Sequence, residues 1–319
     1  ALMQEAQYPM ALGQRLAMML RFGPDHPYGR PARGLPATVK TLSREELVAF
    51  YERTWRPDGA LLVMAGDVTL EQAMDLARRW LGGWSGKPDL RGTVGAADSG
   101  RTGTYYVADL RGAAQTAIVQ TLPAPSRRTP DFDALRLADA VWGGGTFMSR
   151  LNLNLREDEG YTYGASSALG LYRFAGVWLA ASQVQKDKTA AALVEFEREM
   201  AGLAGARPVS DAELDQARVN RIRGFAQQFE GLGRFVGQVA ALWRHELPLT
   251  RWQEEVAGLQ ATDLVAVNAA AAKYVRPSEV ITVLVGDADA IVAQLREKGM
   301  GPIVRIDEEG RELPMAPGP

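Results

Sequence analysis

The chain of 319 residues contains no cysteine and only two histidines, and these shortages restrict its chemistry. Without cysteine, disulfide bonds and thiolate metal ligands are excluded. A catalytic zinc ion usually has three protein ligands, commonly including two or more histidines, often at helical spacing. His26 and His245 are far apart in the sequence, and no His-x-x-Glu-His pattern occurs. The sequence therefore predicts no metal ligands and no catalytic zinc in this chain by itself.

The chain also has no excess of basic residues, since it contains 36 Lys and Arg and 38 Asp and Glu. This balance predicts no nucleic-acid partner and no basic membrane-surface segment. No apolar run approaches the roughly 18–20 residues that span a bilayer, so no membrane insertion is expected. The chain begins at Ala1 without a leader-like segment. We therefore expect that an upstream segment has been removed.

Two blocks of equal length indicate an internal duplication: RPDGALLVMAGD at 56–67 and RPSEVITVLVGD at 276–287. An amphipathic helix precedes each block, and its end is predicted at the Arg-Pro step, since proline cannot continue a helix. The apolar run that follows predicts a strand buried on both faces in each copy. Gly-Asp then turns the chain, and a second helix is expected after it.

The offset between the blocks, 276 − 56 = 220, predicts the domain organisation. A chain of this length favours two domains. If the second unit begins near Arg101, the first would begin about 120 residues before Ala1 (101 − 220). We therefore expect 1–86 to be the C-terminal part of a first domain and 104–319 to be a whole second domain. Residues 87–103, rich in glycine and charge, are expected to be the linker.

The order of elements predicts an α+β fold with two homologous layered domains, the first incomplete at its N-terminus. Each is expected to have a mixed, mostly antiparallel sheet covered by helices. Paired strands are expected in 104–125 and a hairpin in 161–184. Helices are expected at 1–23, 43–54, 131–143, 188–203, 210–227 and 232–246, with capping boxes at Ser43–Glu46 and Ser210–Glu213.

Three short motifs favour structural roles over chemical ones. The glycine cluster GGGTF (143–147) lacks the Gly-Lys-Ser/Thr ending of a phosphate loop, which favours a hinge or close helix packing. His26, in a loop rich in proline, is expected to be a hydrogen-bonding strut. His245, near a helix end, is expected to interact with the terminal carbonyls.

The segment NLREDEGYTYGASS (154–167) contains the candidate site residues Arg156 and Tyr163. On spacing alone, Arg156 at a solvated helix end paired with its acidic neighbours is the favoured interpretation. A guanidinium and a phenol together are suited to bind a peptide carbonyl or a developing oxyanion. The residues by themselves leave both interpretations open.

Several motifs in order along the chain resemble the pitrilysin/insulinase family of zinc metallopeptidases, especially its short bacterial and processing-peptidase-like branch. The resemblance covers nearly the whole chain. It rests on HPYGRP (26–31), LSREELVAFYERTWRPDGALLVMAGDV (42–68), QTAIVQTLPAP (115–125), GGGTFMSRLNLNLREDEGYTYGASS (143–167) and PVSDAELDQAR (208–218).

The resemblance implies two similar α+β domains that close around a peptide like a clamshell. In the family, the first domain carries His-x-x-Glu-His and a distal glutamate ligand, and the second supplies an arginine and a tyrosine. By motif position these are Arg156 and Tyr163, as substrate- and transition-state-binding residues. The family's zinc ligands lie upstream of the HPYGRP region, outside this chain; Glu5 is not expected to be one. Zinc is therefore expected in the missing upstream part or in a partner subunit.

Two functions remain open from the sequence. The chain is either part of an active zinc metallopeptidase or a non-catalytic partner or scaffold subunit of the same fold, and alone it is expected to be inactive. An unrelated small-molecule binder is disfavoured by the motif order. The expected partners are a peptide substrate and either a zinc-bearing subunit, in a homo- or heterodimer, or the chain's own missing N-terminal half. Resemblance to exported bacterial members favours the periplasm.

Overall fold

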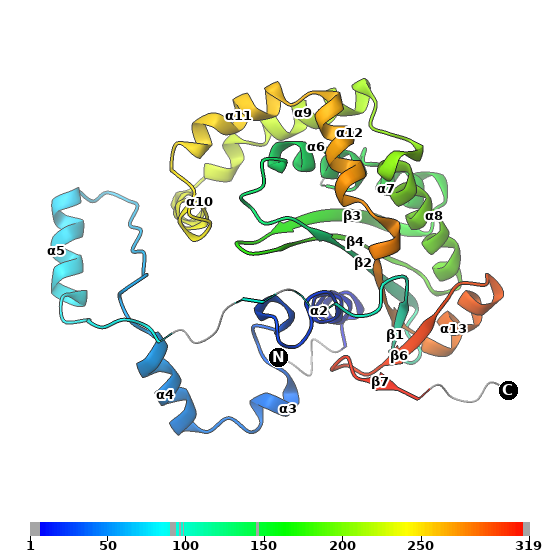
Figure 1. The fold of residues 1–319 in the computed structure, drawn as a ribbon, viewed down its shortest axis with the longest axis horizontal. Coiled ribbons are helices and arrows are strands. Elements are labelled where there is room, and N and C mark those ends of the chain that lie inside the picture. Colours follow the sequence, from blue (N-terminus) through cyan, green and yellow to red (C-terminus); the bar gives the residue numbers. More distant parts are fainter. Residues whose placement is uncertain (1–6, 90–93, 96, 98, 145–146, 315–319) are drawn as a thin grey trace.

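The computed structural model describes residues 7–89, 94–95, 97, 99–144 and 147–314. Its main body is a seven-stranded mixed sheet with helices on both faces (Figure 1). The strands lie side by side in the order β3-β4-β2-β5-β1-β6-β7. Their bounds are β1 Tyr105–Asp109, β2 Gln115–Ala124, β3 Thr162–Leu171, β4 Gly176–Gln185, β5 Ile281–Gly286, β6 Ile303–Ile306 and β7 Glu312–Leu313.

The pairing of the strands confirms the α+β fold class and corrects one detail. β3 and β4 form the predicted antiparallel hairpin, and β4 continues antiparallel onto β2. β1 and β2 both form within 104–125, but the expected pairing between them is wrong because β5 lies between them. β5 is antiparallel to β2 and parallel to β1. A strand contributed from far along the chain separates two sequence neighbours, which local patterning does not reveal.

One face of the sheet is covered by most of the helices and holds the larger core. Trp142 and Trp178 meet there edge to face, with their ring centroids 5.3 Å apart. The helices expected at 131–143, 188–203, 210–227 and 232–246 form with each end within four residues of the expected one, whereas the helix expected at 1–23 begins only at Pro9. The helices that follow β2 are α6 Phe132–Trp142, α7 Arg150–Asn152, α8 Thr189–Ala201, α9 Asp211–Arg223, α10 Leu232–Arg244, α11 Arg251–Ala261, α12 Leu264–Tyr274 and α13 Ala288–Glu297.

The opposite face of the sheet is covered by α2 (Pro9–Phe22), near the start of the chain (Figure 1). Leu12 and Leu16 of α2 are buried in a second core with side chains of β1, β2 and β5. Arg21, also buried, donates from Nη2 to the carbonyl of Glu279 at 2.7 Å. Although it lies within 1–86, α2 therefore packs on the sheet formed by residues 104–319.

The rest of the N-terminal segment stands away from this body (Figure 1). It comprises α3 (Pro36–Val39), α4 (Arg44–Thr54) and α5 (Leu70–Leu81), none of which contains a buried residue. Both α4 and α5 begin with a capping box, which accounts for their start points without tertiary contacts. Large apolar side chains, including Trp80, nevertheless lie at their surface.

The first copy of the duplicated block does not form the predicted strand. Residues 60–65 lie between α4 and α5, as the second copy lies between α12 and α13, but they form no ladder with any described strand. A strand is stable only when neighbouring chains satisfy its backbone groups. The second copy, β5, has such neighbours on both sides in β1 and β2. The order of helix, extended run and helix is therefore shared, whereas the sheet is not.

Candidate functional site

Arg156 lies on a π-helical turn, Leu153–Asp158, that continues α7. The wide turn is closed by the amide of Glu159, which donates to the carbonyl of Asn154 at 3.0 Å. The guanidinium carbon of Arg156 lies 4.8 Å from the ring centroid of Phe147, and its Nε is 3.5 Å from Oε1 of Glu157. The side chain is 36% exposed, so an aromatic ring and one acidic neighbour orient it while it stays accessible. Single π turns of this kind are frequent at functional sites.

Tyr163 occupies a β-bulge at the start of β3. The register with β4 shifts between Thr162 and Ala165, so Tyr163 and Gly164 together stand opposite one residue. Hydroxyl groups brace the bulge: the amide of Gly164 donates to Oγ1 of Thr162 at 3.1 Å, and Oγ of Ser182 donates to the same oxygen at 2.9 Å. Tyr163 is 90% exposed.

Tyr161 and Tyr163 differ although residues two positions apart face the same side of a regular strand. Tyr161 precedes β3, and the bulge at Tyr163 and Gly164 interrupts the alternation between them. Tyr161 packs against the larger core, and a hydrogen bond to Glu159 together with burial raises the pKa of its phenol. Only Tyr163 therefore presents a free phenol at this end of the strand.

Asn152 connects the surroundings of the two candidate residues. Its Nδ2 donates to the carbonyl of Phe147 at 3.0 Å, and its Oδ1 accepts from the amide of Ala165 at 3.3 Å. The ring that contacts Arg156 and the strand that carries Tyr163 are thus held by one buried amide. No hydrogen bond or ring contact joins Arg156 directly to Tyr163 in the described part of the chain, so both side chains are open to a third group.

The two histidines lie in unrelated surroundings. His26 is buried, stacks on Phe22 with 5.0 Å between ring centroids, and accepts from the amide of Tyr28 at 3.1 Å, as a structural strut does. His245 caps the end of α10, and burial is the main cause that lowers its pKa. Among the described residues, no group of three or more His, Asp or Glu side chains is placed to hold a metal ion. These residues therefore do not fit a zinc site.

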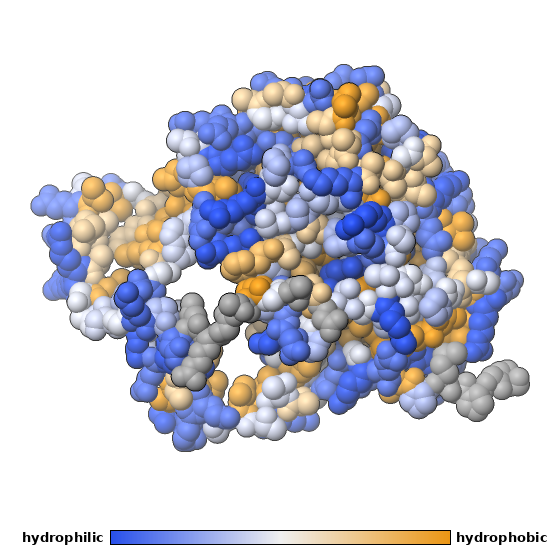
Figure 2. Space-filling view, viewed as in Figure 1, coloured by the Kyte–Doolittle hydropathy of each residue, from blue (hydrophilic) through white to orange (hydrophobic). Residues whose placement is uncertain are grey.

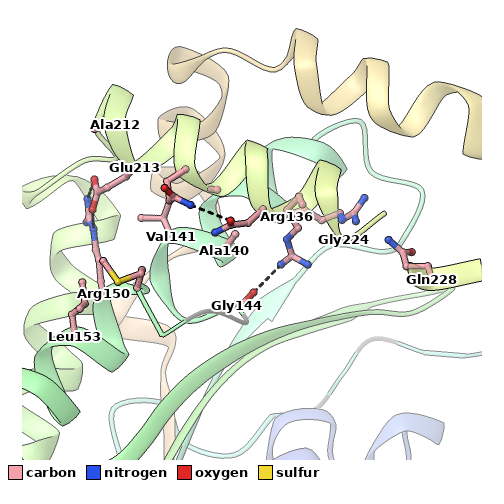
Figure 3. Close-up of a pocket in the computed structure, with 15 residues that line it drawn as sticks. Arg136, Ala140, Val141, Gly144, Arg150, Leu153, Ala212, Glu213, Gly224 and Gln228 are labelled. Atoms are coloured by element: carbon pink, nitrogen blue, oxygen red, sulfur yellow. Dashed lines mark hydrogen bonds and ion pairs between the residues drawn. The ribbon is translucent and has the colours of Figure 1, made fainter. Parts of the chain in front are cut away.

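A hollow of about 630 Å³ lies between α6, α9 and the segment around α7 (Figure 3). Arg150 and Glu213 lie at one end of it and Gln228 at the other (Figure 3). At the buried end, Nε of Arg150 donates to Oε1 of Glu213 at 2.6 Å, and Nη2 donates to Oε2 at 2.7 Å. Nη2 of Arg221, which also lines the hollow, donates to the carbonyl of Gly144 at 3.3 Å. Residues 145–146 of the glycine cluster, for which a hinge was expected, lie outside the described residues, as does Glu5.

Sequence reasoning missed the side chains that position this region. The capping box at Ser210–Glu213 is confirmed, but its glutamate also binds Arg150, more than sixty positions earlier. Asn152 and Thr162 are ordinary polar residues in the sequence and acquire their roles only through the folded turn and bulge. The glycine after Tyr163 was a weak signal of an irregular strand.

The geometry defines an α+β lobe that exposes Arg156 and Tyr163, and comparison with known proteins gives its family. Residues 41–220, more than half of the chain, match the family described as the peptidase M16 inactive domain, and the chain belongs to that family. The predicted kinship with pitrilysin/insulinase-type zinc peptidases is confirmed.

Relatives and solved structures support the same assignment. A protein of Mycobacterium leprae described as an uncharacterized zinc protease is 27% identical over 263 residues, which cover 81% of this chain and 57% of that protein. This chain thus spans little more than half of that relative. A peptidase M16 inactive domain from Pseudomonas fluorescens superimposes with a TM-score of 0.79 at 22% identity, covering 89% of this chain and 67% of that one. A protease from Helicobacter pylori gives 0.73 at 16% identity, covering 84% and 65%. At these identities the structural likeness establishes the fold.

No helix in the described ranges has the length and apolarity needed to cross a bilayer.

Proposed function

We propose that this chain supplies the substrate-binding lobe of a two-lobed zinc peptidase. In this proposal, Arg156 and Tyr163 bind the peptide backbone and stabilise the oxyanion of the tetrahedral intermediate across a cleft. The zinc ion belongs to the other lobe, either upstream in the same polypeptide or in a partner subunit. The observation that carries the proposal is the β-bulge, which holds the phenol of Tyr163 free beside a turn that orients Arg156.

The chemistry of the two side chains suits this role. A guanidinium retains its charge at any working pH and offers several N–H donors in one plane. A neutral phenol donates one hydrogen bond, which strengthens as negative charge develops on the acceptor. Both groups are preorganised, Arg156 by the ring of Phe147 and Tyr163 by the hydroxyl-braced bulge. They therefore need little reorganisation to meet an oxyanion.

The internal repeat supports the assignment of residues 1–86 to the end of another lobe. Leu47 of α4 is 55% exposed, whereas its counterpart 220 positions later, Val267 of α12, is 0% exposed. Helix α12 is covered by α6 and its neighbours. Leu61 is likewise exposed where its counterpart Ile281 lies in the central strand β5. Large apolar side chains that are exposed together on a protein surface normally mark an interface. We infer that a further sheet and its helices cover α4 and residues 60–65.

The same comparison of positions 220 residues apart applies to α2 and α10, the helices proposed to lie between the lobes. Leu12 and Gly13 of α2 correspond, at the same offset, to Leu232 and Gly233 of α10. Leu12 is 3% exposed on the sheet described here, whereas Leu232 is 60% exposed. Figure 2 shows apolar atoms at the surface around α10 and α5. We infer that α10 packs on the sheet of the first lobe, as α2 packs on the sheet of the second.

Kinetics of the complete peptidase test the role of Tyr163. In the assembled enzyme, Tyr163→Phe should lower kcat by about tenfold to a thousandfold and leave KM nearly unchanged, because the lost hydrogen bond forms mainly in the transition state. The matched control is Tyr161→Phe, which removes a phenol oxygen two positions away on the core side. A wild-type kcat in Tyr163→Phe would remove the oxyanion role.

A non-catalytic scaffold subunit is the alternative, and one observation favours it. A chain of complex III from Candida albicans superimposes with a TM-score of 0.78 at 11% identity, covering 94% of this chain and 72% of that one. The fold therefore also occurs in a protein named as part of a multi-subunit complex. In a scaffold, Tyr163→Phe would alter neither cleavage nor assembly, and the sequence encoded upstream would lack His-x-x-Glu-His.

A further inference from the structure

A second hollow, of about 570 Å³, adjoins the one in Figure 3 and shares Arg136, Gly144, Arg221 and Gln228 with it. It lies between the start of α6, the facing sides of α10 and α11, and the outer half of the edge strand β3. Neither hollow contains Arg156 or Tyr163 in its lining. The second hollow is therefore separate from the proposed oxyanion site, and its ligand has to be inferred from its own lining residues.

Three arginines line this hollow, and two of them are neutralised. Arg136 forms an ion pair with Glu255, and Nη2 of Arg221 lies 3.3 Å from Oδ2 of the buried Asp139. For Arg127, no ion pair or hydrogen bond of the guanidinium exists among the described residues. The hollow consequently carries one cation in excess of the carboxylates that line it.

Aromatic stacking fixes the unpaired guanidinium in place. The Arg127 guanidinium carbon lies 3.3 Å from the ring centroid of Phe132. A ring face satisfies the flat side of a guanidinium and leaves its in-plane N–H donors available. Burial and then repulsion by Arg251 lower the pKa of Arg127 to about 10, so it remains charged at neutral pH. The carboxylate of Glu255, which acts in the opposite direction, is already bound to Arg136.

We propose that this hollow binds the carboxylate of a peptide through Arg127, as a subsite remote from the oxyanion site. The inference rests on the proposed peptide-binding function and adds to it the chemical group that is recognised. A planar guanidinium binds a carboxylate through two parallel hydrogen bonds, which neutral groups do not replace. The incoming negative charge also relieves the repulsion between Arg127 and its basic neighbours.

The open edge of β3 indicates that the carboxylate belongs to a peptide. The outward amides of this strand donate to Asn152 at Ala165 and to Gly143 at Ser167, at 3.3 and 2.9 Å. The next outward position is Leu169, which lines the hollow and has no such partner among the described residues. An extended peptide can pair with a free strand edge through its backbone.

The remaining walls suit an apolar side chain next to the carboxylate. Leu171, Leu242, Leu247 and Trp252 line the hollow. Nδ1 of His245 is buried with no hydrogen-bond partner among the described residues, and it provides one further polar atom at this wall. A peptide that ends in a hydrophobic residue satisfies both the charge and the apolar surface. An internal acidic residue beside a hydrophobic one is the other source of the same chemistry.

Binding of three labelled peptides to the 319-residue chain, followed by fluorescence anisotropy, tests the subsite. The peptides share one sequence ending in leucine and carry a free carboxylate, a C-terminal amide, or an amide with glutamate at the penultimate position. The free acid should bind about tenfold or more tightly than the plain amide, as expected for a charge-assisted pair of hydrogen bonds. Arg127→Gln should remove this preference, and Arg127→Lys should retain only part of it.

Arg128→Gln is the matched control, because Arg128 is the neighbouring residue, lies outside the hollow and binds Glu246 at 3.1 Å. It should leave the preference for the free acid intact. Recovery of binding by the glutamate peptide would assign the subsite to acidic side chains, and lack of recovery would assign it to the peptide terminus. Equal binding of acid and amide, persistence of the preference in Arg127→Gln, or no binding at about 1 mM peptide overturns the subsite. None of these results changes the kinetic test of Tyr163, so the two proposals fail independently.

Discussion

Glu213 shows how one carboxylate can fix both a helix start and a distant turn. It accepts from the amide and hydroxyl of Ser210 at 2.9 and 2.8 Å, which closes the capping box of α9. It also accepts two hydrogen bonds from the nearly buried Arg150, which in turn donates to the carbonyl of Pro208 at 2.9 Å. Removal of the carboxylate would leave Arg150 buried without its charge partner, which is costly in a protein interior.

The pKa of Glu213 makes this contribution dependent on pH. Burial raises this pKa, but hydrogen bonds from Arg150 and Ser210 outweigh it and lower the pKa from 4.5 to about 2. Because the folded pKa is the lower one, the ionised carboxylate stabilises the fold above about pH 4.5. That stability is lost as the pH falls towards 2. Since the side chain is about one-third exposed, we expect roughly 1–3 kcal/mol.

Glu213→Gln should therefore lower the free energy of unfolding by about 1–3 kcal/mol at pH 7 and flatten its decline between pH 4.5 and 2. Urea denaturation at a series of pH values measures both effects. Glu230→Gln, at an exposed glutamate, is the control and should change neither. A variant with wild-type stability at pH 7 would show that the Arg150–Glu213 pair does not stabilise the fold.

At the scale of elements, features that depend on neighbouring residues could be predicted from the sequence, whereas features that depend on contacts with distant segments could not. The capping boxes at Ser43 and Ser210 each depend on two residues only three positions apart, so the starts of α4 and α9 could be predicted closely. The pairing of β1 with β5 depends on a segment distant in the sequence, and residues 60–65 form no strand because no described strand pairs with them. The candidate residue Tyr163 was found by motif resemblance, whereas the bulge that exposes it arises from β4 pairing.

Two equivalent glycines allow a test of how the N-terminal helix packs. A Cβ added to Gly13 of α2 would lie 3.0 Å from Cγ2 of Val119 and 3.4 Å from Cγ2 of Val285, whereas none would meet an atom within 4 Å at Gly233 of α10. Gly13→Leu should destabilise the chain by about 1–3 kcal/mol through overpacking. Gly233→Leu should be neutral or slightly stabilising, because leucine has the higher helix propensity. Chemical denaturation measures both, and equal effects would contradict the close packing of α2.

For the whole molecule, the described surface is that of one sheet-and-helix lobe joined to a segment that exposes large apolar side chains. A hollow of about 1320 Å³, lined by Trp55, Trp84 and Trp243 among others, separates that segment from the end of α10. Both sides of this hollow expose large aromatic side chains, which in water favour burial against a further partner. In the proposed function, that partner is a zinc-bearing lobe.

This organisation predicts that the 319-residue chain alone performs no zinc-dependent proteolysis. In the proposed function, Arg156 and Tyr163 stabilise charge on a carbonyl under attack, but neither of them would supply an activated water molecule as a zinc-bound centre does. The purified chain incubated with an unstructured peptide and zinc should give the same product profile with and without a chelator. The same peptide with the complete two-lobed enzyme is the positive control, and its cleavage should stop when the chelator is added. Chelator-sensitive cleavage by the isolated chain would mean that its own residues form the metal centre. The proposal that the zinc ion belongs to another lobe would then be wrong.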